Sequence, residues 1–80
     1  MTSVEIEYCV PCGHLDRAQQ LQEALLEEFG QRLDGVRLAT GDGGVFEVRV
    51  DGEQVFDVDE EAYDTDTIVE RVGDRLPATA

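Results

Sequence analysis

The sequence contains two cysteines, Cys9 and Cys12, with only two residues between them. A short alternating pattern of apolar residues precedes the pair, and a pattern with helical spacing follows it. A C-x-x-C at such a junction, in a chain whose first residues lack the pattern of a secretion signal, favours redox chemistry over a structural crosslink. A bond between these sulfurs would close a loop of about four residues and contribute roughly 2 kcal/mol, less than a long-range disulfide contributes. Reversible dithiol–disulfide chemistry is therefore the leading interpretation.

Pro11 lies between the cysteines and suits the first position of a helix, because it lacks a backbone N–H and has a fixed φ. A helix beginning there would hold Cys12 in its first turn and leave Cys9 outside as the more exposed sulfur. The unpaired N–H groups and the dipole of a helix start stabilise a nearby thiolate. We therefore expect Cys9 to attack a substrate disulfide and Cys12 to resolve the mixed disulfide, with the reverse order as the alternative.

Six further residues are expected to border the cysteine pair: Tyr8, Val10, Pro11, Gly13, His14 and Phe46. Tyr8 and Phe46 would shape an apolar docking surface. His14 is close enough in sequence to influence the cysteines, although a histidine at a helix start is more often an ordinary surface residue than a proton shuttle.

Two other functions remain open for the same residues. Zinc binding could use Cys9, Cys12 and His14, but a closed structural zinc site needs four ligands, so a carboxylate or a second chain would have to complete it. The chain could also be a protein-interaction module in which the cysteines are incidental. In the leading interpretation the protein needs no metal and no cofactor.

The composition is strongly acidic, with 19 Asp and Glu against 6 basic residues and a net charge of −13. Such a field repels phosphate groups, so we expect neither nucleic acid nor a membrane as a partner. No apolar run approaches the length of a membrane span. Hydrophobic residues make up 41% of the chain and recur periodically, which favours one folded domain over disorder.

All six basic residues are arginines, and there is no lysine. This acidic, lysine-free composition fits a halophilic cytosol, where molar salt shortens the Debye length to about 3 Å and screens self-repulsion. A very soluble acidic protein is the simpler alternative. The expected location is cytoplasmic.

The alternation before the cysteines predicts a strand over residues 3–8, with one apolar face formed by Val4, Ile6 and Tyr8. A helix is predicted from about residue 11 or 13 to an end between Phe29 and Asp34, because apolar residues recur there at spacings of three and four. Its buried stripe would be Leu15, Ala18, Leu21, Leu25 and Phe29.

The second half of the chain is predicted to complete a mixed sheet. Residues 36–40 would return as a parallel strand in a right-handed crossover, and the glycine-rich residues 41–44 would form a loop. Residues 45–50 and 53–58 would pair as an antiparallel hairpin around an Asp51-Gly52 turn.

A second helix is predicted to begin near residues 64–67. Thr67 with Glu70 has the spacing of a capping box, and Asp64 or Thr65 could cap the helix one turn earlier. Pro77 would end the helix, whose buried face would be formed by Ile68, Val69, Val72 and Leu76.

Three stretches together resemble one family. Residues 4–13, the following Arg17-Ala18, and residues 43–52 with their G-V-F-E-V strand look like the Rdx family, the selenoproteins W, T and H and their cysteine-containing prokaryotic relatives. The resemblance extends over residues 4–73. It implies a two-layer α/β (α+β) fold of thioredoxin-like type, in the order β-α-β-β-β-α, with four strands in a mixed sheet. A single domain over residues 1–76 and a frayed tail over 77–80 would follow.

The resemblance also implies a function. Members of the family are presumed thiol–disulfide oxidoreductases in cell redox homeostasis, often linked to glutathione or thioredoxin systems. Protein or low-molecular-weight thiols and disulfides would then be the partners. In the selenoproteins of the family, selenocysteine occupies the position that matches Cys12, which supports the reverse order of attack.

Overall fold

The computed structural model describes residues 2–76. Its elements are β1 (Ser3–Cys9), α1 (Leu15–Phe29), the 3₁₀ turn η1 (Gly30–Arg32), β2 (Gly35–Gly41), β3 (Phe46–Val50), β4 (Glu53–Asp57) and α2 (Thr65–Asp74). The predicted β-α-β-β-β-α order is confirmed. The predictions of a helix end at Pro77 and of a frayed tail over 77–80 lie outside the described residues.

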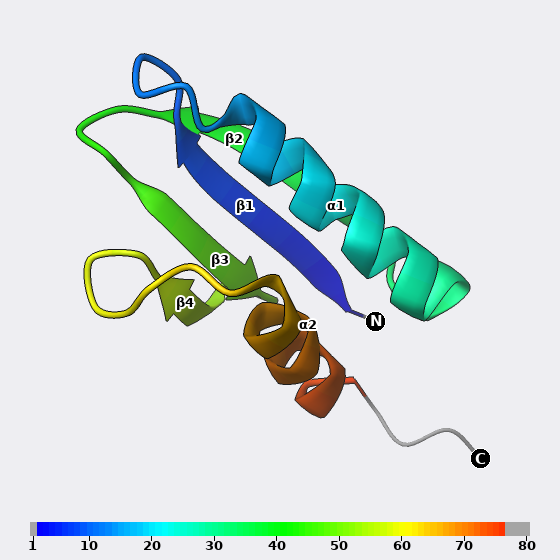
Figure 1. Ribbon diagram of the computed structural model, residues 1–80. Coiled ribbons are helices and arrows are strands. Elements are labelled where there is room, and N and C mark those ends of the chain that lie inside the picture. Colours follow the sequence, from blue (N-terminus) through cyan, green and yellow to red (C-terminus); the bar gives the residue numbers. More distant parts are fainter. Residues whose placement is uncertain (1, 77–80) are drawn as a thin grey trace.

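The four strands form one mixed sheet in the order β2-β1-β3-β4. β1 pairs with β2 in parallel from Ser3 opposite Gly35 to Cys9 opposite Gly41, and with β3 in antiparallel. Both helices cover the same face of the sheet, α1 in front of β1 and β2, and α2 in front of β3 and β4 (Figure 1). The predicted two-layer arrangement with two helices is therefore confirmed, and β1 lies in the interior of the sheet.

The core lies between the sheet and the two helices. Along β1 and β3 every second side chain is apolar and points into it. Leu15, which was expected in the buried stripe of α1, is 43% exposed because it is the first residue of the helix. Phe29, at the other end of the stripe, is only partly buried. The fully buried side chains of the core include Ile6, Ala18, Leu21, Leu25, Phe46, Val48, Ile68 and Val72.

Within residues 2–76 no helix covers the other face of the sheet, which carries charged side chains. Arg49 donates from Nη1 to Glu5 Oε1 at 3.0 Å, and from Nη2 to Glu7 Oε1 at 3.1 Å and Glu47 Oε1 at 2.5 Å. Glu5 also pairs with Arg37. Burial alone would lower the pKa of Arg49, but the hydrogen bond to Glu7 and the three carboxylate charges more than offset it and raise that pKa.

The hairpin turns as predicted at Asp51 and Gly52, whose φ angles of 52° and 87° are those of a two-residue turn with both residues left-handed. One irregularity was not predicted. Val48 pairs with Phe56 but Arg49 pairs with Gln54, so one extra residue bulges from β4.

Asp64 caps α2, because its Oδ1 accepts hydrogen bonds from the backbone N–H of Asp66 at 3.0 Å and of Thr67 at 3.3 Å. The earlier of the two predicted caps is thus confirmed. The capping box at Thr67 is wrong, because Thr67 already lies inside the first helical turn. Neither α1 nor α2 is long and apolar enough to cross a membrane.

Candidate functional site

The cysteine motif begins at the end of the interior strand β1. Cys9 is the last residue of this strand and is fully buried. Its backbone N–H donates to the carbonyl of Val45 at 2.8 Å, and the N–H of Val10 donates to the carbonyl of Gly41 at 3.1 Å. These bonds reach to both sides of β1, so the backbone around Cys9 is held by Gly41 at the end of β2 and by Val45 just before β3.

The two cysteines are joined as a disulfide, with their Cα atoms 5.3 Å apart. A tight turn carries the chain from one to the other, closed by a hydrogen bond from the N–H of Gly13 to the carbonyl of Val10 at 3.1 Å. Pro11 is the second residue of this turn and Gly13 the fourth, positions that both residues favour in β-turns. Cys12 lies at the third position and is exposed.

The helix does not begin at Pro11. Gly13 has a φ of 77°, a left-handed conformation that interrupts any helix, and α1 begins only at Leu15 with His14 as its N-cap. Cys12 is therefore outside the helix. The expectation that Cys9 would be the more exposed sulfur is wrong in this disulfide form, because the fixed φ of Pro11 serves a turn that leaves Cys9 buried in the sheet and carries Cys12 outward.

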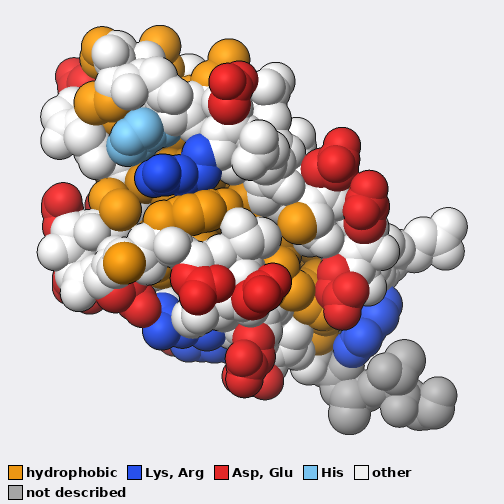
Figure 2. All heavy atoms as spheres, viewed as in Figure 1, with side chains coloured by type: hydrophobic (Ala, Val, Ile, Leu, Met, Phe, Trp, Pro, Cys, Tyr) orange, Lys and Arg blue, Asp and Glu red, His pale blue; other side chains and the backbone are white. Residues whose placement is uncertain are grey.

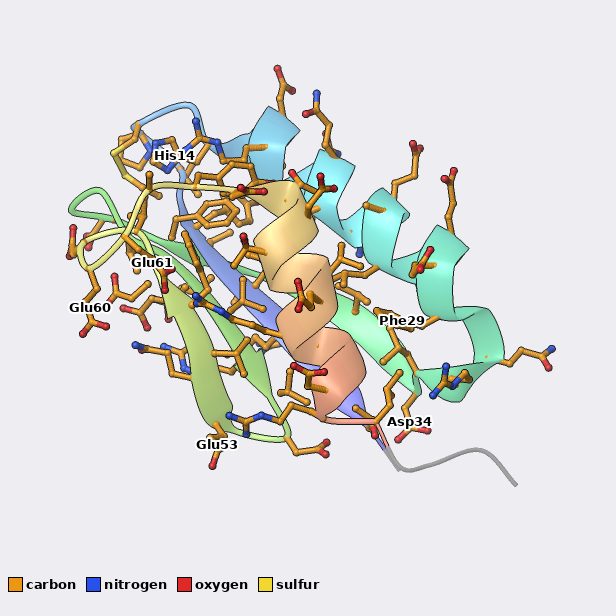
Figure 3. The ribbon with its side chains drawn as sticks, turned by 60° about the horizontal axis from the view of Figure 1, so that its bottom comes forward. His14, Phe29, Asp34, Glu53, Glu60 and Glu61 are labelled. Atoms are coloured by element: carbon orange, nitrogen blue, oxygen red, sulfur yellow. A yellow bond between two sulfur atoms is a disulfide. The ribbon has the colours of Figure 1, made fainter. Side chains whose placement is uncertain are left out.

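His14 packs against the motif and is not an ordinary surface residue. It is half-buried, its backbone N–H donates to the carbonyl of Cys9 at 3.4 Å, and its ring meets the ring of Phe46 edge-on with 6.0 Å between the ring centres. Its Nδ1 atom is buried and has no hydrogen-bond partner within residues 2–76. Figure 3 shows His14 at the opposite end of the molecule from Phe29 and Asp34.

An aromatic cluster lies beneath His14 and consists of Phe46, Phe56 and Tyr63. The ring of Phe46 is 5.3 Å from that of Tyr63 and 6.4 Å from that of Phe56, all in edge-to-face arrangement. The loops that follow β1, β2 and β4 gather at this end of the sheet (Figure 1). Tyr63 lies in the last of these loops and is the half-buried member of the cluster.

The predicted docking surface formed by Tyr8 and Phe46 is wrong. Tyr8 is 7% exposed and Phe46 is fully buried, because the alternation of β1 and β3 directs both side chains into the core. Of the apolar residues expected next to the cysteines, Val10 is exposed, at 51%. Pro11 and Gly13 are exposed beside it in the turn.

Arg17 is a site residue that the spacing arguments missed. Its guanidinium carbon lies 4.5 Å from the centre of the Tyr63 ring and 6.0 Å from that of Phe46. Figure 2 shows the pale blue histidine side chain next to a blue basic one, with orange apolar atoms below them. Arg17 follows His14 by one helical turn, and it is part of the stretch that carries the family resemblance, but neither signal reports its contacts, since the partner rings come from distant elements.

A metal site is not formed by these residues. Within the described part of the chain, no three His, Cys, Asp or Glu side chains are grouped so that they could hold a metal ion. Cys9 and Cys12 are bonded to each other. The arrangement thus offers one buried and one accessible sulfur, and no ligand set around them.

Comparison with known proteins agrees with this geometry. The sequence matches the Rdx family over residues 3–74. The chain belongs to the Rdx family. This Rdx protein also has its two cysteines at disulfide distance, and the two observations together support a redox-related thiol function.

Solved structures give the same picture of this Rdx chain. A protein from Bordetella parapertussis is 34% identical, with a TM-score of 0.88 over 94% of this chain and 98% of that one. A selenoprotein W-related protein from Vibrio cholerae is 29% identical, with a TM-score of 0.87 over 91% of this chain and 94% of that one. No curated protein is similar enough to match.

Proposed function

We propose that the protein is a small thiol–disulfide oxidoreductase that cycles between a Cys9/Cys12 dithiol and the disulfide described above. The observation that carries this proposal is the unequal placement of the sulfurs. Cys12 is exposed in a turn, whereas Cys9 is fully buried at the end of β1. A substrate can approach the first sulfur, and the second is held within reach to complete the reaction.

The reaction has two exchange steps. The thiolate of Cys12 attacks one sulfur of a substrate disulfide, which breaks that disulfide, forms a mixed disulfide and releases the first substrate thiolate. The thiolate of Cys9 then attacks the Cys12 sulfur and releases the second substrate thiolate. The two thiol protons end on the released thiols, and two electrons pass to the substrate. A cellular dithiol or two monothiols return the protein to its reduced form.

This order of attack reverses the one expected from a helix start at Pro11. It agrees with the resemblance to the selenoproteins, in which selenocysteine stands at the position of Cys12. The substrates we propose are protein or low-molecular-weight disulfides, acted on in cellular redox homeostasis. Nucleic acids are not proposed as partners, because the net charge of −13 repels phosphate groups.

Trapping of the mixed disulfide tests the proposal. The reduced protein, freed of reductant, is mixed with hydroxyethyl disulfide and followed by mass spectrometry. The wild type should reduce one equivalent and form the intramolecular disulfide. Cys9→Ser should stop at a mixed disulfide on Cys12, and Cys12→Ser should react far more slowly.

Two results would overturn the proposal. A wild-type protein that reduces no disulfide would remove the oxidoreductase function. A Cys12→Ser protein that forms the mixed disulfide as fast as Cys9→Ser does would show that the burial of Cys9 does not decide the order of attack. Iodoacetamide labelling of the reduced wild type gives an independent measure, since Cys12 should be alkylated first.

A further inference from the structure

In the part of the chain that the structure describes, Arg17 differs from most arginines in having no acidic partner. Arg37, Arg49, Arg71 and Arg75 each form an ion pair with a glutamate. Within residues 2–76, Arg17 forms neither an ion pair nor a side-chain hydrogen bond, although the chain has 19 acidic residues. Its guanidinium is instead held by the faces of aromatic rings.

Two acidic side chains in the loop after β4, and one at the end of β4, have other partners. Glu61 pairs with Arg71 through two hydrogen bonds of 2.5 and 2.8 Å, and Asp64 caps α2. Asp57 accepts from the N–H of Asp59 at 2.9 Å. Within residues 2–76 the hydrogen-bond donors of Arg17 have no partner, and its guanidinium lies over Tyr63, which belongs to the same loop.

The ring of Phe46 connects this cation to the residues beside the cysteines. Phe46 lies 6.0 Å from the guanidinium carbon of Arg17 and 6.0 Å from the ring of His14. The backbone N–H of His14 in turn donates to the carbonyl of Cys9. A guanidinium binds carboxylates with two parallel N–H donors, and stacking on an aromatic face leaves those in-plane donors open.

From these contacts we propose that Arg17 is a substrate-binding residue that anchors a carboxylate of the disulfide substrate. This inference rests on the proposed oxidoreductase function. The aromatic cluster holds the guanidinium by cation–π contact, and the substrate carboxylate takes the place of the missing acidic partner while its sulfur meets Cys12. The protein thus selects disulfides that bear a carboxylate near the sulfur, either small dithio acids or peptides with an acidic residue next to the cystine.

A charge series of disulfides tests this selection. Reduced protein is mixed with 3,3′-dithiodipropionate, which is anionic, with neutral hydroxyethyl disulfide, and with cationic cystamine, and the single-turnover rates are compared. The protein's overall negative field disfavours anions, so the informative quantity is the anionic-to-neutral rate ratio in each variant relative to wild type. Arg17→Gln should lower this ratio about tenfold, the scale of one charge-assisted hydrogen bond at a partly exposed site.

Arg32→Gln is the matched control. Arg32 also lacks an ion pair in the described residues, lies 6.0 Å from the ring of Phe29, and belongs to η1 at the far end of α1. The control carries the same change in net charge and should keep the wild-type ratio. Arg17→Lys, which keeps the positive charge, should retain most of the wild-type anionic-to-neutral rate ratio. An equal loss of rate for all three disulfides in Arg17→Gln would overturn the proposal, as would an unchanged ratio.

Two peptides separate the possible sources of the carboxylate. A small cystine-bridged peptide with aspartate next to each cysteine is compared with its asparagine counterpart. A preference for aspartate that Arg17→Gln removes assigns the site to acidic protein disulfides. If Arg17→Gln slows the reaction with dithiodipropionate but not with the aspartate peptide, the site is assigned to small acids. If Arg17→Gln slows neither reaction, the proposal is overturned.

A binding measurement keeps the proposal independent of the redox reaction. The oxidised wild type is titrated with 3-(methylthio)propionate and with its neutral amide, and the Nε–H resonances of Arg17 and Arg32 are followed by NMR. The carboxylate should shift Arg17 alone, and the amide should shift neither. If the protein reduced no disulfide, the oxidoreductase proposal would fail while this titration still decided the carboxylate site.

Discussion

Replacing Arg49 by Gln should destabilise the protein through the open face of the sheet. The substitution removes the cation that donates to all three of Glu5, Glu7 and Glu47, and of these carboxylates only Glu5 keeps another partner within residues 2–76, Arg37. The arginine side chain is 26% exposed, so solvent screens each pair and about 0.2–1 kcal/mol per pair is appropriate. Three pairs together give about 0.6–3 kcal/mol, and we take the middle of this range, a loss of about 1–2 kcal/mol in the free energy of unfolding.

For a domain of this size, a loss of that magnitude lowers Tm by about 4–16 °C. Circular dichroism melts at neutral pH and 0.1 M NaCl measure it, with Arg32→Gln as a control that changes the net charge equally without breaking an ion pair. The control should melt within about 3 °C of wild type, as surface substitutions do. A melting temperature for Arg49→Gln inside that same interval would refute the reasoning, and the three hydrogen bonds would then contribute no net stability.

Three further outcomes follow from the charges and the helix cap. Asp64→Ala should lower the free energy of unfolding, measured in urea, by about 1 kcal/mol, whereas Glu70→Gln should leave it almost unchanged, because Asp64 and not Glu70 caps α2. Equal losses in the two variants would favour the capping box instead. The hydrogen bond from Arg71, partly opposed by desolvation, lowers the pKa of Glu61, so the stability from this pair is present above the unfolded-state pKa and is lost as the pH falls through the lowered value. Glu61→Gln should therefore be less stable than wild type at neutral pH and equally stable in strong acid, and a difference that persists there would contradict this. The wild-type Tm should rise between 0.1 M and 2 M NaCl as the Debye length falls from about 10 Å to below 3 Å, and a constant Tm would remove the argument from net charge.

The regular elements were predictable because their patterns had one interpretation. Alternation in β1 and β3 directs Val4, Ile6 and Val48 into the core, and no other register would bury them. Asp51-Gly52 combines two residues that tolerate positive φ at the position where two strand patterns meet. The sheet and its hairpin follow from these local preferences.

The site was less predictable for two reasons. One residue suits two different local conformations, and one contact joins residues that are far apart in the sequence. Pro11 suits both the first residue of a helix and the second residue of a turn, and the hydrogen bond between Val10 and Gly13 decides between them. The contact of Arg17 with Tyr63 joins α1 to a loop that comes after all four strands. No periodicity in the sequence reports such a contact, and the exposure of each sulfur follows from the turn.

The disulfide joins residues only three positions apart, and the strand before it is held by the backbone bonds of Cys9 and Val10 to its two neighbours. The bond therefore fixes neither the strand order nor the packing of the helices, and a newly synthesised chain can reach its native structure without being oxidised first. Because the two cysteines are so close in sequence, their oxidation state can be recognised by another molecule only near them. We expect reduction to change only the turn and to leave the rest of the surface as it is, so any protein that binds one oxidation state of this chain in preference to the other has to contact the turn itself.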